Sequence, residues 1–77
     1  NVMKFMPELT KEILPRILPL LKDKKEWVRV DTVIALEEAI KVVPEQAEKI
    51  ALELLPLLKD KESGVRQKTV VALEHAI

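Results

Sequence analysis

The sequence repeats itself with a period of 37 residues. When residues 4–40 are laid over residues 41–77, the same amino acid occurs at 20 of the 37 positions. The longest identical run, LPLLKDK, occupies residues 18–24 and again 55–61. A period of this length is typical of architectures in which each repeat is one supersecondary unit that buries its apolar face by stacking on a neighbour. The period therefore constrains the fold more than any other feature of the chain.

Helical spacing of apolar residues predicts two helices in each repeat. Pro7 and Pro44 suit the first position of a helix, where the missing N–H is not needed. The first helix is expected to end near residue 21 or 58, and the second to begin after a charged turn, with Ser63 as N-cap in the second repeat. Pro19 and Pro56 are expected to kink the last turn of each first helix.

Two apolar faces are predicted to form the core. The first helices present one face, and the second helix of the first repeat presents a broad arc when its residues are placed 100° apart. A further proline at position 15 predicts a second break in the first repeat only. The predicted core residues are Leu9, Ile13, Ile17, Leu20, Leu21, Ile50, Leu54, Leu57 and Leu58 on the first helices, and Val28, Thr32, Val33, Ala35, Leu36, Ala39, Ile40 and Val43 on the second.

The repeated unit resembles the HEAT repeats. The residues that carry the resemblance are Leu18, Pro19, Leu20, Leu21, Asp23, Val28, Arg29, Ala35 and Leu36, and their equivalents Leu55, Pro56, Leu57, Leu58, Asp60, Val65, Arg66, Ala72 and Leu73. The resemblance implies an all-α fold of two stacked HEAT-like helical hairpins, a short right-handed α-α superhelix. It also implies a ladder of hydrogen bonds made by Asp23, Arg29, Asp60 and Arg66. Thr32 and Thr69 stand where the family often has alanine, and their hydroxyls are expected to bond to the carbonyl one turn earlier.

The repeat divides the chain into parts of one α-solenoid unit. Residues 7–43 form the first repeat, residues 44–77 form a truncated second repeat, and residues 1–6 align with the tail of a preceding helix. We therefore expect a fragment of a longer array, although an engineered two-repeat chain stays open. Solenoids need polar terminal caps, and neither end shows one. The uncapped end faces are expected to associate with other molecules.

The composition bounds the class of protein. The chain has no cysteine or tyrosine, one histidine and one glycine, so a thiol nucleophile and a glycine-rich phosphate loop are excluded. We expect no enzyme activity, metal or cofactor, and we interpret His75 as a solvated side chain. No apolar run approaches the length of a membrane span, and we expect a cytoplasmic location. Abundant Lys, Glu, Val and Ile resemble the bias of heat-adapted proteins.

Charge argues against nucleic acid as the partner. Thirteen basic and thirteen acidic residues leave no net charge, and the balance holds in each repeat. Binding to the phosphate backbone requires a basic stripe. A nucleic-acid-binding array would therefore need basic repeats on either side of this one.

An apolar strip on the second helices is the candidate binding site. Trp27, Val30 and Ile34 fall among charged residues opposite the core arc, and Val71 repeats Ile34. An aromatic anchor with a charged rim is typical of protein interfaces. Two alternatives remain: Trp27 covers the end of the helix pair, or Val30 and Ile34 contact a preceding helix. The rim consists of Asp31, Glu38, Gln67, Lys68 and His75.

The sequence leaves three hypotheses for the function. The leading hypothesis is a non-enzymatic scaffold that binds another protein or a peptide through the strip. The second is a structural spacer or self-associating repeat that uses its end faces. The third is the nucleic-acid-binding array that basic flanking repeats would allow.

Overall fold

The computed structural model describes residues 7–77, and within this range every regular element is a helix. The α-helices are α2 (Pro7–Ile17), α3 (Glu26–Val42), α4 (Ala47–Leu54) and α5 (Ser63–Glu74). Three 3₁₀ segments accompany them, η1 (Leu18–Lys22), η2 (Pro44–Gln46) and η3 (Leu55–Lys59). The predicted all-α class is confirmed. The helix tail predicted for residues 1–6 lies outside the described residues.

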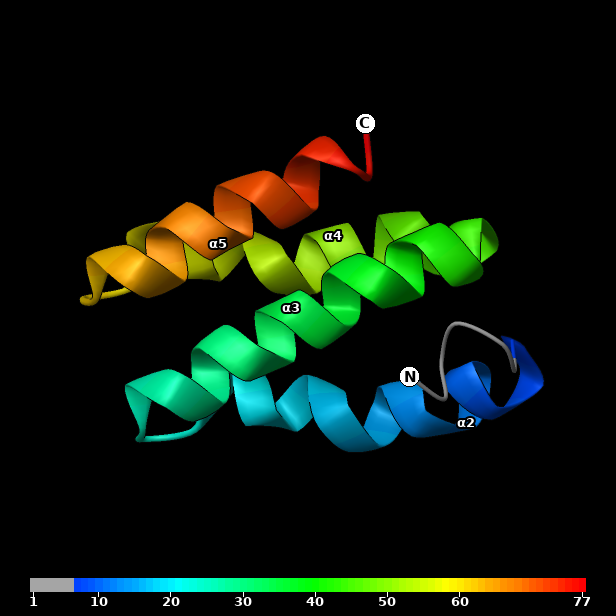
Figure 1. Ribbon diagram of the computed structural model, residues 1–77, viewed down its shortest axis with the longest axis horizontal. Coiled ribbons are helices and arrows are strands. Elements are labelled where there is room, and N and C mark those ends of the chain that lie inside the picture. The colour runs from blue at the N-terminus through cyan, green and yellow to red at the C-terminus, as the bar shows by residue number, and fades with distance from the viewer. Residues whose placement is uncertain (1–6) are drawn as a thin grey trace.

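Helix α3 occupies the centre of the molecule. It contacts α2 and η1 of its own repeat, and η2, α4 and α5 of the next. In Figure 1, α3 and α5 run side by side in the same direction, while α2 and α4 run the opposite way. No helix within residues 7–77 combines the length and apolarity needed to cross a bilayer.

The prolines change the type of helix at the end of each first helix. Helices α2 and α4 end at Ile17 and Leu54, and the following LPLLK segments are 3₁₀ helices with proline near their start. Proline lacks the N–H of an α-helical hydrogen bond, and a tighter 3₁₀ turn is common at helix ends. Pro15, by contrast, lies inside α2, which continues to Ile17, so the predicted second break is absent. One missing hydrogen bond does not end this helix.

An aspartate, rather than Ser63, organises the start of each second helix. Ser63 is the first residue of α5 and its N-cap position is taken by Glu62, which makes no side-chain cap. The prediction of Ser63 as N-cap is therefore wrong. Asp60 Oδ1 accepts the N–H of Glu62 at 2.9 Å, and Asp23 Oδ1 accepts that of Lys25 at 2.9 Å. Each aspartate thus satisfies a backbone donor in the turn itself.

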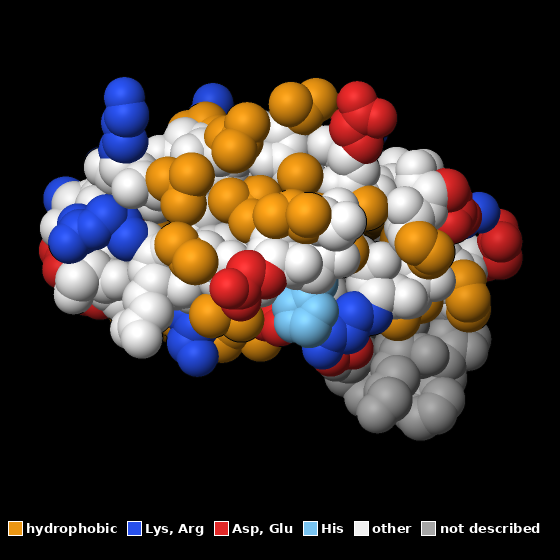
Figure 2. All heavy atoms as spheres, turned by 90° about the horizontal axis from the view of Figure 1, so that it is seen from above, with side chains coloured by type: hydrophobic (Ala, Val, Ile, Leu, Met, Phe, Trp, Pro, Cys, Tyr) orange, Lys and Arg blue, Asp and Glu red, His pale blue; other side chains and the backbone are white. Residues whose placement is uncertain are grey.

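The core lies where α3 meets the second repeat. Thr32 and Thr69 are buried and donate to the carbonyls of Val28 and Val65, as predicted. Two members of the predicted core, Leu20 and Leu58, are instead exposed. Exposed apolar side chains form a band on the α5 side of the molecule (Figure 2). The buried apolar residues are Leu14, Leu21, Val33, Leu36, Ala39, Ile40, Val43, Ile50, Leu54, Leu57, Val65 and Ala72.

Replacing Leu36 by Ala should lower the free energy of unfolding by about 2–5 kcal/mol, because its side chain is fully buried and leaves a cavity. The matched control is Leu52→Ala on the exposed side of α4, expected to change stability by less than about 0.5 kcal/mol. Urea unfolding followed by circular dichroism measures both. Equal losses would contradict the assignment of the core.

Candidate protein-interaction surface

A buried ion pair joins the two repeats. Arg29 Nε lies 2.8 Å from Asp60 Oδ2 and its Nη2 lies 3.1 Å from Asp60 Oδ1, a bidentate arrangement. The two side chains are only 7% and 10% exposed. Arg29 Nη1 also donates to the carbonyls of Asp23 and Lys24, at 2.8 Å and 3.1 Å. The guanidinium therefore ties the turn of the first repeat to the turn of the second.

The surroundings of this pair favour the charged forms of both side chains. Burial alone would raise the pKa of Asp60, but hydrogen bonds from Arg29 and from the N–H of Glu62 outweigh it and lower that pKa below its ordinary value of 3.8. The hydrogen bond to Asp60 raises the pKa of Arg29. Because paired charges with satisfied hydrogen bonds tolerate burial, Arg29 remains charged inside the junction.

The other two ladder residues are only half engaged. Arg66 donates through Nη1 to the carbonyl of Asp60, as Arg29 does to that of Asp23. Among residues 7–77, no carboxylate meets the guanidinium of Arg66 and no arginine meets the carboxylate of Asp23. Of the four residues implied by the resemblance, the structure brings Arg29 and Asp60 together across the repeats.

The second-helix face is the outward side of α3 and α5, and it carries the predicted strip. Ile34 on α3 and its equivalent Val71 on α5 are both exposed, whereas Val30 is half-buried against the core. Helices α3 and α5 pack against each other, so these two exposed residues lie on neighbouring helices. Of the predicted rim residues, Asp31, Gln67, Lys68 and His75 are exposed and Glu38 is half-buried.

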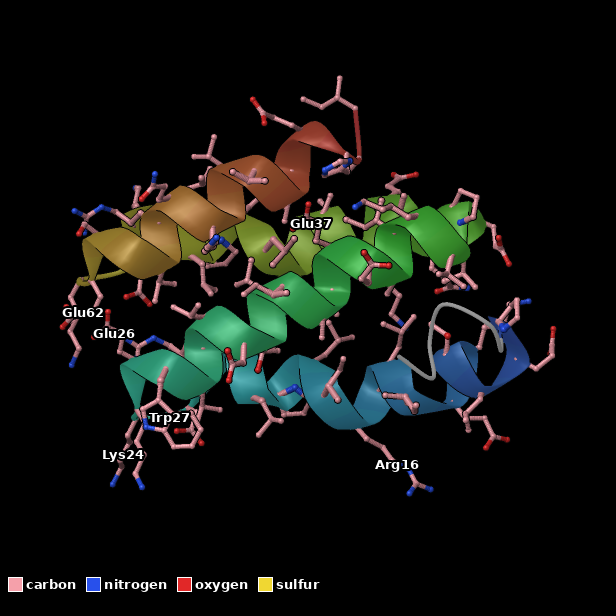
Figure 3. All side chains as sticks on the ribbon, viewed as in Figure 1. Arg16, Lys24, Glu26, Trp27, Glu37 and Glu62 are labelled. Atoms are coloured by element: carbon pink, nitrogen blue, oxygen red, sulfur yellow. The ribbon has the colours of Figure 1, made fainter. Side chains whose placement is uncertain are left out.

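Three contacts between charged or titratable side chains lie on α3 and between α3 and α5. His75 Nε2 lies 2.8 Å from Glu37 Oε2, which joins α5 to α3. Lys41 Nζ lies 3.5 Å from Glu38 Oε1 and 3.9 Å from Glu37 Oε2. Figure 3 shows Glu37 between the two helices. His75, expected to be merely solvated, therefore has a partner across the helices.

Trp27 lies apart from Ile34 and Val71. Its side chain is 63% exposed and projects from the start of α3 beside Lys24, away from α5 (Figure 3). Lys25 Nζ stands 5.8 Å from the centroid of its ring. Trp27 lines a hollow of about 220 Å³ to which neither Ile34 nor Val71 contributes; the other lining residues are Ile17, Leu20, Val28, Asp31, Thr32 and Ala35.

The hollow was missed in the sequence because Leu20 was assigned to the core. Its equivalent Leu57 is buried, so the residue type and the repeat position predict burial equally well for both. The difference lies in the neighbour: Leu57 has the first repeat beside it, while Leu20 has no described residues there. The sequence holds no signal for this difference, because Leu20 and Leu57 lie in identical LPLLKDK segments.

The described residues were searched for metal ligands, and the chain was compared with known proteins. Among residues 7–77, no three His, Asp or Glu side chains converge where they could hold a metal ion. Comparisons of the chain with known protein families, with curated proteins and with solved structures gave no match.

Replacing Asp60 by Asn should lower the melting temperature by more than about 10 °C, because Arg29 would stay buried without its counter-charge. The matched control is Asp23→Asn, which keeps an oxygen for Lys25 N–H and breaks no contact with an arginine; a change below about 3 °C is expected.

Because folding lowers the pKa of Asp60, the contribution of its carboxylate to the free energy of unfolding is complete above pH about 4. This contribution is lost as the pH falls through the folded-state pKa. Thermal unfolding between pH 2 and 7 checks both, and identical acid profiles for wild type and Asp60→Asn would contradict the assignment.

Replacing Trp27 by Ala should change the free energy of unfolding by less than about 0.5 kcal/mol, because most of the ring faces solvent. Thermal unfolding of the variant beside the wild type measures this. A loss of more than about 10 °C in melting temperature would show instead that the ring covers the end of the helix pair.

Proposed function

We propose that the chain is a HEAT-like helical-repeat module that binds another protein and performs no catalysis. Its two units share the LPLLKD segment and the same order of first helix, 3₁₀ segment and second helix. The Arg29–Asp60 pair across the units supports the stacked-hairpin interpretation. The family assignment itself rests on the resemblance of the sequence motifs.

The observation that carries the proposal is the exposed apolar surface on the second-helix face. Ile34 and Val71 lie open on adjacent helices, where a helix facing only water would be polar. The same two helices also carry exposed charged and amide side chains, among them Gln67 and Lys68. Such a patch favours a protein partner with an apolar ridge and a charged margin. The contacts of Glu37 with Lys41 and His75 restrain these side chains before a partner binds, which reduces the entropy lost on binding.

The charge pattern favours protein over nucleic acid as the partner. The charged rim residues carry both signs, with Asp31 on α3 and Lys68 at the equivalent place on α5. Lys41 is bound to two glutamates rather than free for phosphate. Within residues 7–77 these contacts leave no uninterrupted basic stripe on the second-helix face, and such a stripe is what a phosphate backbone needs.

Site-specific photocrosslinking tests this proposal. A photoreactive residue at position 34 or 71 should form covalent adducts with one partner protein in the cells from which the chain comes. The same residue at position 52 is the control, because Leu52 is exposed on α4 outside the second-helix face. Equal labelling from position 52, or no adduct from 34 and 71, would reject the second-helix face as the recognition surface.

A further inference from the structure

Equivalent residues of the two repeats, 37 positions apart, differ in burial in a systematic way. Leu20 is 41% exposed, whereas its equivalent Leu57 is 7% exposed. Ile17, Val28 and Ala35 are half-buried, whereas their equivalents Leu54, Val65 and Ala72 are buried. These residues of the second repeat lie on the side that receives α3. Ile17, Leu20, Val28 and Ala35 therefore form an N-terminal end face with the shape of a repeat junction and no described repeat on it.

The opposite side of the molecule shows the complementary difference. Leu21 is 4% exposed and its equivalent Leu58 is 39% exposed. Val33 is buried and its equivalent Val70 is exposed. Leu58 and Val70, with the half-buried Leu73, therefore form a C-terminal end face; this side carries the hydrophobic band of Figure 2. This face repeats the surface with which the first repeat covers the second.

The two half-engaged ladder residues belong one to each end face. Asp23 lies at the N-terminal end face and Arg66 at the C-terminal end face. Arg66 is the equivalent of Arg29, and Asp23 is the equivalent of Asp60. Within one chain, Arg29 meets Asp60 across the junction and Arg66 meets no carboxylate among residues 7–77. If the junction were repeated between two molecules, Arg66 of one would meet Asp23 of the next in the same bidentate way. The charges of the two end faces are thus complementary at the position that matters most inside the chain.

At the edge of the junction, a small residue faces a large one, and the equivalent pair between two copies has the small and large residues on the opposite sides. A Cβ added at Gly64 would lie 3.5 Å from Glu26 Oε2, so a small residue of the second repeat faces a large one of the first. At a repeated junction the equivalents are Trp27 and Ser63. The large residue would then lie on the N-terminal end face and the small one on the C-terminal end face. Trp27 is 63% exposed beside Leu20 and Val28, so a copy stacked on the N-terminal end face would cover its ring.

We infer that the occupant of these faces is a second copy of this chain, stacked head to tail so that the C-terminal end face of one copy covers the N-terminal end face of the next. The contact is heterologous and leaves one face free at each end, so it builds open linear oligomers rather than a closed dimer. It uses a different surface from the second-helix face and does not depend on the proposed function.

Two rim contacts of the repeated junction are unfavourable. Inside the chain, Lys11 Nζ lies 3.1 Å from Glu45 Oε2, and the corresponding residues between copies are Glu48 and Glu8. The His75–Glu37 contact likewise becomes Glu38 with Glu74. Like charges at these places weaken the association. We expect a dissociation constant of about 1–100 μM. They also provide a site where a single change should strengthen it.

Sedimentation velocity of the 77-residue chain tests the stacking first. The weight-average mass should rise with concentration through the dimer and beyond, without a plateau at two copies. A monomer at every concentration up to about 1 mM, well above the expected dissociation constant, would overturn the inference. A mass that stops at the dimer would overturn it as well, since a self-complementary pair has that signature.

Complementing variants test the head-to-tail geometry. Leu20→Glu disables only the N-terminal end face and Val70→Glu only the C-terminal end face; both side chains are exposed, so folding should survive, as circular dichroism can verify. Each variant alone should be monomeric, while an equimolar mixture should form a dimer and nothing larger. The control is Ile34→Glu, equally exposed at 41% but on the second-helix face, which should oligomerise like wild type. A mixture that stays monomeric, or loss of assembly in Ile34→Glu, would overturn the geometry.

Glu48→Lys tests the register. It recreates between copies the Lys11–Glu45 contact of the chain, with Glu8 as the new partner. The association constant should rise by about two- to fivefold at low salt, the gain expected of an exposed pair. Glu53→Lys, on the exposed side of the same helix, changes the net charge equally and is the control. Equal responses would show that net charge rather than register controls assembly.

Discussion

The guanidinium of Arg29 is the interaction on which the rest of the structure depends. It bonds to both oxygens of Asp60 and to the carbonyls of Asp23 and Lys24, so it connects the two turns that precede the second helices. A cation in this position requires its counter-charge, because an unpaired buried charge is far more costly than the pair. Asp60 also caps the turn of its own repeat through the N–H of Glu62. One pair therefore sets the turn geometry and the register of the repeats together.

Around this pair, apolar burial depends on neighbours rather than on any one repeat. A helix pair of this size cannot cover both of its faces, and α3 becomes the centre because it has another helix pair beside it. The same logic explains why Leu57 is buried and Leu20 is not. Two kinds of exposed apolar surface result, one on the second-helix face with Ile34 and Val71, the other on the end faces with Leu20 and Leu58.

Much of the fold could be predicted from the sequence because repeats make the pattern redundant. Helical spacing and the prolines predict four α-helices, and Thr32 and Thr69 make the predicted backbone bonds. The prediction of Ser63 as N-cap was wrong although serine is a good N-cap in general. Here the side chain of Asp60 accepts the N–H of Glu62 in the turn before the helix. The separation of Trp27 from Ile34 was not predictable from a helical wheel. A wheel gives the angle of a residue around the helix axis, but neither its position along the axis nor its side-chain rotamer. What covers an end face is not encoded locally at all.

Native-state hydrogen exchange of the backbone amides tests most directly the claim that the junction makes the two repeats one cooperative structure. The slowest amides of α3 and α5 should open with the same free energy, equal to that of global unfolding, because neither helix keeps its burial without the other. If α4 and α5 exchange through an opening of much lower free energy while α2 and α3 remain protected, the two repeats unfold independently, which would contradict a cooperative junction.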